Sequence, residues 1–287
     1  MAQFLHLFET ENEFTSAYTG ENYNEPWVSY TEENKKVKYN KTRQDILLET
    51  PLTLEALTDG TIGWRIKYSF SSYGTPAAKT VKYSKNGGEW TEITSASGSS
   101  YPKIDVLAGD IIQFVGNNVT YGGDVAGNRY GSNLIGTCDF IAYGNIMSLL
   151  RETGFANLKT TRVTGQDYRY TFADLFDGNY THLKDVSDLQ LPATELSTNS
   201  YWYMFKDCTS ITTAPVLPSP TADYYGMFYN CRNLNYVKCL ATSLPRTNAW
   251  MTNVQTVEGT FVKAPGAVWQ RGVNGIPENW TIVEDTE

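Results

Sequence analysis

The chain has 287 residues, of which 41% are hydrophobic and 19% are charged. This length accommodates two ordinary domains, and the apolar fraction is sufficient for packed cores, which argues against general disorder. The net charge is -8, and no run of Lys and Arg is long enough to follow a phosphate backbone, so no nucleic acid partner is expected. The densest basic stretch, 35–43, lies beside Glu32 and Glu33 and is expected to be a solvated strand face.

The first residues, 1–9, contain no basic region followed by an apolar core, so no secretory signal is expected. No apolar run reaches the roughly 18 residues of a membrane-spanning helix, and we expect no membrane insertion. The chain is therefore expected to act inside a cell, or to leave it without a signal, for example by assembly into a particle that lysis releases.

Residues 1–50 are expected to form an N-terminal docking arm. Val28 alternates with Tyr30, and Val37 with Tyr39, which predicts two short strands separated by a turn at 33–34. The arm contains too few aliphatic residues to close a core of its own. It is therefore expected to dock on the rest of the chain or on a partner.

Residues 51–150 are expected to form a β-sandwich domain. An unbroken alternation of apolar and polar residues over 62–70 predicts a strand with one buried face. Further strands are expected around Val81, Ile93, 104–106, 112–114 and 140–142. Six or seven short strands in about 95 residues are typical of an antiparallel sandwich.

Two turns are expected to join neighbouring strands of this domain into hairpins. Asn86-Gly87 supplies residues that tolerate the positive φ angles of a tight hairpin turn. The turn at 108–110 separates Ile104 and Val106 from Ile112 and Phe114, and we expect the same hairpin arrangement there.

The Gly-rich stretch 122–131 is expected to be a loop. It lacks the Gly-Lys-Ser/Thr of a phosphate-binding loop and does not open a helix. A calcium site through Asp124 and Asn128 is an alternative, but one carboxylate supplies too little charge for a dedicated site. The apolar run 145–151 then marks the expected junction with a second domain, 151–287.

A repeat is visible within this second domain. Residues 201–211 align with 224–234 at a constant offset of 23, with Met, Phe, Cys and an aliphatic residue in matching places. A weaker copy at 172–178 lies about 29 residues upstream, which implies an insertion, expected at 179–182. A period of 23 falls within the roughly 20 to 29 residues of leucine-rich repeats, whose units bury their apolar faces by stacking.

Each unit is expected to contain one short helix and one extended segment. Met204, Phe205, Cys208 and Ile211 fall at i, i+1, i+4 and i+7, a spacing that places them on one face of two helical turns. The following Pro-rich stretch, 214–218, is expected to be extended because each proline fixes its own φ and restricts the residue before it.

The cysteines are expected to be structural thiols. None of the four, at 138, 208, 231 and 239, has CxxC spacing, and only His6 and His182 could add nitrogen ligands, so no metal site and no cofactor are expected. A disulfide between Cys208 and Cys231 is the alternative. Helix axes ~8–10 Å apart exceed the ~4.4–6.8 Å Cα separation of a disulfide, and buried thiols are therefore favoured.

The repeat has the pattern Met-Phe-x-x-Cys-x-x-Ile/Leu, followed by Leu-Pro. It resembles the BspA-like leucine-rich repeats of gut Bacteroidales proteins and of the phages that infect them, and the resemblance implies a virion surface protein of a crAss-like phage. The likeness covers 172–283, with 259–263 and 275–280 similar to a terminal cap, and 23–30 and 83–90 also look like segments that recur in such proteins. The expected fold class is mainly β with short helices (α+β): an N-terminal β-sandwich followed by a short leucine-rich-like repeat domain with a C-terminal cap.

The resemblance implies surface adhesion or assembly and provides no catalytic residue. Cell-surface members carry an export signal, so its absence favours a virion protein, such as a head or tail fibre or a decoration protein. Its partners would be other virion proteins or a host surface protein or glycan, and a homo-oligomer such as a trimer fits that class. The alternative is a bacterial cell-surface adhesin or glycan-binding module.

Aromatic side chains are the candidate ligand-binding residues, because exposed rings can stack on sugar faces. The alternative is that these rings fill the core. So short a repeat offers little concave surface, which moves the expected binding site toward the junction with the sandwich. The candidates are Trp202, Tyr203, Tyr224, Trp250 and Trp269.

No enzyme is expected. His6 and His182 lie in the arm and in the irregular first repeat, and no Gly-x-Ser-x-Gly motif is present. Acidic pairs such as Asp174 and Asp185 could in principle hydrolyse a glycoside. With 31 acidic residues in the chain, however, any such pair is uninformative, and solvated acids are the expected state.

Overall fold

A computed structural model describes the backbone of strands 27–30 and 36–39 and the residues 42–67, 78–121, 131–162, 169–218, 224–242, 246–254 and 258–286. The fold is mainly β, with one α-helix in the described part of the chain. The possible calcium loop through Asp124 and Asn128 and most of the expected arm lie outside these residues.

The two strands expected in the arm are confirmed. Strand β1 (Trp27–Tyr30) pairs antiparallel with β2 (Lys36–Tyr39). Helix α3 (Arg43–Glu49) follows, and the Thr42 side chain and Asp45 form a reciprocal capping box at its N-terminus. Arg43 pairs with Asp188, so this end of the arm docks on the rest of the chain.

Two antiparallel sheets follow the arm. The strands are β3 (Leu52–Ala56), β4 (Gly60–Ile66), β5 (Thr80–Lys85), β6 (Thr91–Thr94), β7 (Lys103–Val106), β8 (Ile111–Val115), β9 (Ser132–Gly136) and β10 (Phe140–Asn145). In the larger sheet these strands have the order β10-β3-β8-β5-β6, with two later strands added beside β10, and the smaller sheet has the order β7-β4-β9. Buried residues of both sheets, including Phe114 from the first and Trp64 from the second, belong to the same hydrophobic cluster.

The Asn-Gly hairpin is confirmed. Asn86 and Gly87 have φ angles of 52° and 72°, and the Gly88 N–H donates to the Lys85 carbonyl at 2.9 Å. Positive φ at both central residues matches the right-handed twist of the flanking strands. Strands β5 and β6 pair antiparallel on either side of this turn, from Thr80 opposite Thr94 to Tyr83 opposite Thr91.

The hairpin expected between β7 and β8 is wrong. Strand β7 pairs with β4, whereas β8 pairs with β3 and β5 in the other sheet. The turn at Gly109, with φ 88°, therefore takes the chain from one sheet to the other. Alternation and turn residues fix where strands begin and end, but they do not determine which strands pair.

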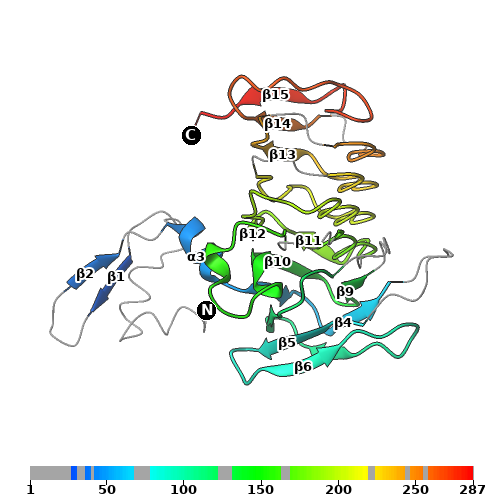
Figure 1. The fold of residues 1–287 in the computed structure, drawn as a ribbon. Coiled ribbons are helices and arrows are strands. Elements are labelled where there is room, and N and C mark those ends of the chain that lie inside the picture. The colour runs from blue at the N-terminus through cyan, green and yellow to red at the C-terminus, as the bar shows by residue number, and fades with distance from the viewer. Residues whose placement is uncertain are drawn as a thin grey trace.

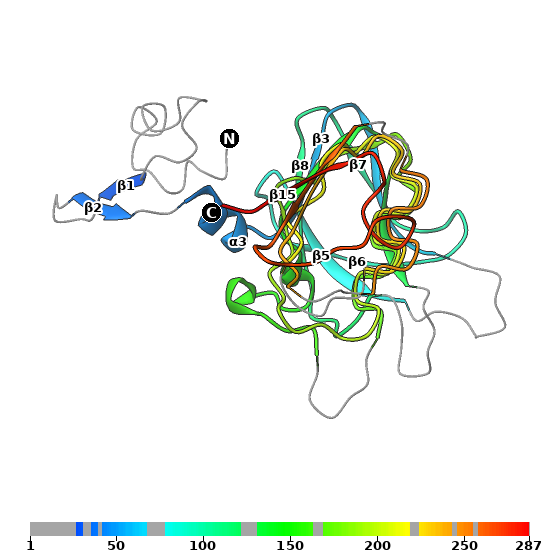
Figure 2. The ribbon, with the colours of Figure 1, turned by 90° about the horizontal axis from the view of Figure 1, so that it is seen from above.

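A stack of coils continues from the larger sheet (Figure 1). Strand β10 pairs in parallel with β11 (Leu183–Asp185) and β12 (Leu189–Gln190), which belong to the first coil. Two 3-10 helices, η1 (Ile146–Leu149) and η2 (Phe155–Asn157), connect the sheets to this coil. Later coils contribute a parallel sheet of β13 (Tyr236–Cys239), β14 (Thr260–Lys263) and β15 (Thr281–Glu284), and the coils overlie one another when viewed along the stack (Figure 2).

The helix expected in each repeat is wrong. The residues in its place, such as 201–207, form a series of consecutive turns, which we call a turn row. Tyr203 and Asp207 have φ angles of 53° and 63°, and a left-handed residue at every fourth position is incompatible with an α-helix. The N–H of Phe205 donates to Met227 of the next coil at 3.0 Å, whereas that of Lys206 donates to Tyr203 within its own coil at 3.1 Å. Neighbouring coils are therefore joined by hydrogen bonds along the whole row. The Pro-rich segment that follows the row beginning at Tyr201 forms parallel bridges to β13 at Thr213 and Leu217.

The repeat register is confirmed by aromatic stacking. Phe176, Phe205 and Phe228 stack with centroids 5.6 Å apart and planes within 4°. The offset of 29 between the first two rings and of 23 between the next two equals the offset in the sequence. A second column links Trp64 of the sheets to the coil that leads into β14 through these buried rings: Tyr121, Phe172, Tyr201, Tyr224 and Trp250.

The expectation of buried thiols is confirmed. All four cysteines are free and buried. The Sγ of Cys208 donates to the Phe176 carbonyl at 3.2 Å, and that of Cys231 to the Phe205 carbonyl at 3.0 Å. Each thiol therefore bonds the preceding coil at an equivalent position. Burial raises the pKa of Cys208 to about 12, so this thiol stays protonated and unreactive at neutral pH.

Candidate functional site

The turn rows divide their side chains into inward and outward pairs. Tyr201, Met204 and Phe205 are buried, whereas Trp202 and Tyr203 are half-buried on the outer face. Twenty-three residues later, Tyr224, Met227 and Phe228 are again buried and Tyr225 is again half-buried, but Gly226, at the position equivalent to Tyr203, is buried. Because each four-residue turn places two side chains inside and two outside, the outer face of the stack is formed by the residues between the buried anchors.

The structure separates the five candidate residues. Tyr224 and Trp250 are fully buried in the aromatic column, so neither ring can contact a ligand in the folded chain. Their place at repeated core positions is the physical reason. Trp269 is half-buried and lies against Trp250 and Phe261, with centroids 5.6 and 4.9 Å away. Trp202 and Tyr203 alone lie together on the outer face.

Trp202 and Tyr203 belong to a cluster of five half-buried rings, which we call the outer aromatic patch. Trp202 is the centre of the patch, and its ring lies 5.2 Å from Tyr170, 5.7 Å from Tyr203 and 4.8 Å from Tyr225. Tyr229 meets the edge of Tyr203 at 6.2 Å. The five rings come from three successive coils, so the patch runs along the stack.

Three members of the patch, Tyr170, Tyr225 and Tyr229, were missed in the sequence. A signal for two of them was present, because Tyr225 and Tyr229 lie 23 residues after Trp202 and Lys206, at positions between the buried anchors. Reading the repeat as a helix concealed the signal, since a helix does not place residues outward in adjacent pairs.

Tyr203 is held in place by the glycine of the following coil. A Cβ atom at Gly226 would lie 2.1 Å from Cε1 of Tyr203, and Gly226 also has a left-handed φ of 58°. Glycine therefore meets two requirements at this position, the backbone conformation and the close approach of the ring. The Tyr203 ring of the patch therefore packs directly against the backbone of the next coil.

A ladder of amide hydrogen bonds runs beside the patch. Asn253 Nδ2 donates to Asn230 Oδ1 at 2.7 Å, and Asn230 Nδ2 donates to Asp207 Oδ1 at 2.6 Å. All three residues have φ near 62°, a conformation that Asn and Asp tolerate better than most residues. The ladder lines the patch with polar groups and ties three coils together.

Lysine and aspartate side chains meet where the patch approaches the sheets. Lys67, which follows β4, forms ion pairs with Asp174 at 3.2 Å and with Asp177, and both carboxylates are nearly fully buried. Burial lowers the pKa of Lys67. Lys206 bonds Asp207 at 2.6 Å and lies 5.9 Å from the centre of the Tyr203 ring.

The pKa of Asp207 reflects opposing effects. Burial raises it, but hydrogen bonds from Lys206 and Asn230 outweigh burial and hold it below its usual value. The carboxylate therefore stays ionised at neutral pH and keeps its place at the end of the ladder.

The acidic residues considered for hydrolysis have other partners. Asp174 pairs with Lys67, and Asp185 accepts hydrogen bonds from the Ser187 N–H and hydroxyl at 2.9 and 3.0 Å. His182 bonds Asp139 at 3.1 Å on a partly exposed surface. His6 lies outside the described residues.

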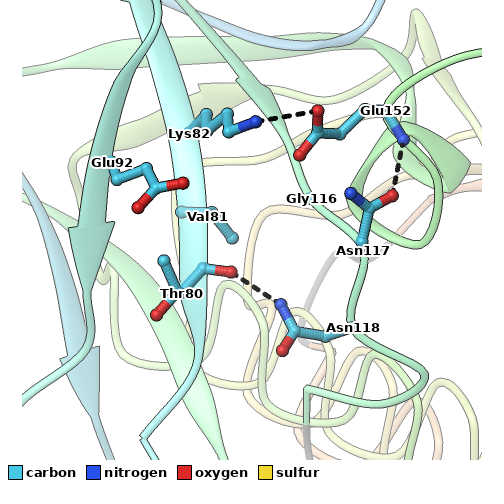
Figure 3. A pocket seen from close by; sticks show the side chains of 8 residues that line it. All are labelled: Thr80, Val81, Lys82, Glu92, Gly116, Asn117, Asn118 and Glu152. Atoms are coloured by element: carbon cyan, nitrogen blue, oxygen red, sulfur yellow. Dashed lines mark hydrogen bonds and ion pairs between the residues drawn. The ribbon is translucent and has the colours of Figure 1, made fainter.

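The pocket in Figure 3 lies between β5, β6 and the segment after β8, and its volume is about 220 Å³. Its polar groups largely bond one another. Lys82 pairs with Glu152 at 3.0 Å, and Asn118 Nδ2 donates to the Thr80 carbonyl at 2.7 Å. The pocket is therefore braced internally and offers few groups for a ligand, and we regard the outer aromatic patch as the stronger candidate site.

Across the described ranges, no group of three or more His, Cys, Asp or Glu side chains is arranged to hold a metal ion. The helices within those ranges are too short or too polar to cross a membrane. Comparison with protein-family models, with curated proteins and with solved structures finds no match to this chain.

Proposed function

We propose that this chain is a non-enzymatic attachment protein of a particle surface, such as a phage virion, and that the outer aromatic patch is its contact surface. Such a protein would be a head fibre, a tail fibre or a decoration protein. We further propose that the coil stack is a short leucine-rich-like repeat array with a terminal cap, which presents the patch on a rigid support.

The observation that carries the proposal is the gathering of five rings on the outside of a stack whose inside already contains two aromatic columns. A globular chain gains stability by burying large aromatic side chains, so a cluster left half-exposed at outward repeat positions needs another explanation. Aromatic residues are also the side chains that contribute most at binding interfaces.

A second candidate is a bacterial cell-surface adhesin or glycan-binding module. The amide ladder favours a glycan, because it includes hydrogen-bonding groups such as Asn230, which directly follows Tyr229 of the patch. Carbohydrate recognition requires this combination of apolar faces and nearby polar groups. A particle protein and an adhesin could bind the same sugar, so location separates them.

The test combines binding, turnover and location. Purified chain is incubated with Bacteroidales cells and with their isolated surface polysaccharides, and purified phage particles are searched for the chain by mass spectrometry. We expect retention on cells, polysaccharide of unchanged length, and the chain in particles. Shortened polysaccharide would contradict the non-enzymatic assignment, and presence on bacteria but not in particles would favour the adhesin.

A further inference from the structure

Among the described residues, the last strand of the coil stack is paired on one side only. Strand β15 lies at the end of the parallel sheet β13-β14-β15, and within the described residues no strand pairs with its outer side. Figure 1 shows β15 at the far end of the stack from the sheets. An open edge presents backbone groups that can pair with another chain.

The hydrogen bonds to β14 identify which groups point outward. The N–H of Thr281 donates to Gly259 and that of Asp285 to Lys263, both at 2.8 Å. Backbone groups alternate in direction along a strand, so Ile282 and Glu284 direct their N–H and carbonyl groups away from β14.

The opposite end of the stack is closed. The Leu134 N–H donates to the Leu175 carbonyl, and the Tyr121 N–H to Thr171, both at 2.8 Å. Together with β10, which pairs with β11, these segments of the sheet region cover the first coil. Head-to-tail growth of one stack on another is therefore blocked, and a two-fold contact between two C-terminal ends remains.

A two-fold register centred on Val283 fits β15 to a second copy of itself. Ile282 then lies opposite Glu284 of the second copy, and the outward groups of each pair exchange hydrogen bonds, about four in all. Glu284 does not face its own counterpart. It is also paired with Lys263 at 2.6 Å, and Asp285 with Lys238 at 2.9 Å, which limits repulsion between the two acidic ends.

The final coil also contains exposed apolar side chains. Val268, Val273 and Val283 are 81%, 73% and 39% exposed, and all three follow β14 in the final coil. We propose that the C-terminal end of the stack is a self-association surface, at which β15 of two copies pair antiparallel to form a two-fold dimer. This proposal is independent of what the outer aromatic patch binds.

The experiment measures the mass of the full chain by light scattering over a range of concentrations. We expect twice the single-chain mass of 32.2 kDa for the natural sequence. The variant Ile282→Pro removes an N–H that β14 does not use, and we expect it to be monomeric. The matched control Ile282→Ala loses the side chain but keeps the N–H, and it should remain dimeric.

Amide exchange gives a second readout that does not depend on the variants. The amides of Ile282 and Glu284 should become protected as concentration rises, while that of Thr281, which bonds β14, is protected throughout. A monomeric natural chain, a dimer that Ile282→Pro leaves intact, or exchange at Ile282 that is independent of concentration would each overturn the proposal. A trimer would do so as well, because a two-fold contact cannot produce one.

Discussion

At the residue scale, the turn rows depend on side chains that permit a left-handed backbone. Asn, Asp and Gly occupy most of these positions, as at Asn199, Asp207, Gly226 and Asn230, whereas Tyr203 and Ala249 adopt the same conformation without that intrinsic tolerance. Such residues keep it only where the surrounding hydrogen bonds determine it. The joining of coils through every second N–H supplies that constraint.

A substitution at Gly226 tests how closely the Tyr203 ring of the outer aromatic patch packs on the next coil. Gly226→Ala should lower the free energy of unfolding by about 2–4 kcal/mol, because a left-handed alanine costs about 1–2 kcal/mol and the overlap with the Tyr203 ring adds to it. The matched control is Gly266→Ala, where φ is 71° and nothing lies near the new Cβ. Gly266→Ala should lower the free energy of unfolding only by the cost of a left-handed alanine. Equal losses in urea unfolding would show that the ring does not press on Gly226.

Asp110 provides a pH-dependent prediction. A hydrogen bond from the Leu107 N–H, with others from Lys85 and Asn86, lowers the pKa of Asp110 from 3.8 to about 2. Because the pKa of the folded state is the lower one, the stabilisation is complete above the usual value and is lost as the pH falls toward 2. Asp110→Asn should therefore cost about 1 kcal/mol at neutral pH. The unfolding free energies of the natural chain and of Asp110→Asn, measured from pH 7 to pH 3, should therefore approach each other. A difference between them that stays constant with pH would contradict this prediction.

Local residue patterns were predictable where neighbours in sequence determine the structure. The alternation around Trp64 and the Asn86-Gly87 turn were both confirmed, because steric preferences within a few residues decide them. The outward placement of Tyr225 was not anticipated. It depends on the four-residue period of the turn row, which is close to the 3.6 residues of a helical turn and gives the same spacing of buried anchors.

At the element scale, each coil is held by its neighbours and has no helix or hairpin of its own. The pairing of β7 with β4 in place of β8 is a similar case, since partners far apart in sequence decide it. Neither arrangement is encoded in a short window of sequence. The repeat itself was visible, because identical stacking positions require similar side chains in each coil.

Phe205 tests the dependence of one coil on the next. Its ring stacks between Phe176 and Phe228 and is fully buried. Phe205→Ala should reduce the free energy of unfolding by about 3–5 kcal/mol, since the cavity removes contacts with two neighbouring coils. Tyr229→Ala, which truncates an outward ring nearby, should cost about 1 kcal/mol. Similar losses for the two variants in urea unfolding would refute the division into inner columns and outer patch.

At the scale of the whole molecule, the sheets and the coils share one hydrophobic cluster. Strand β10 pairs with β11, and the column of rings passes from Trp64 through Tyr121 into the coils. The sheet region therefore closes the first end of the stack. Sequence patterns could indicate a sheet region and a repeat region, but the shared core depends on contacts between residues far apart in the chain.

We propose above all that this scaffold presents the outer aromatic patch to a host surface. The most direct test of this proposal compares the retention on host cells of Trp202→Ala with that of Trp90→Ala. Trp90 is 45% exposed but is not part of the patch, so the second variant controls for the loss of a surface tryptophan. We expect Trp202→Ala to weaken retention about tenfold or more, and Trp90→Ala to bind like the natural chain. Equal retention of both variants would show that the outer aromatic patch is not the contact surface.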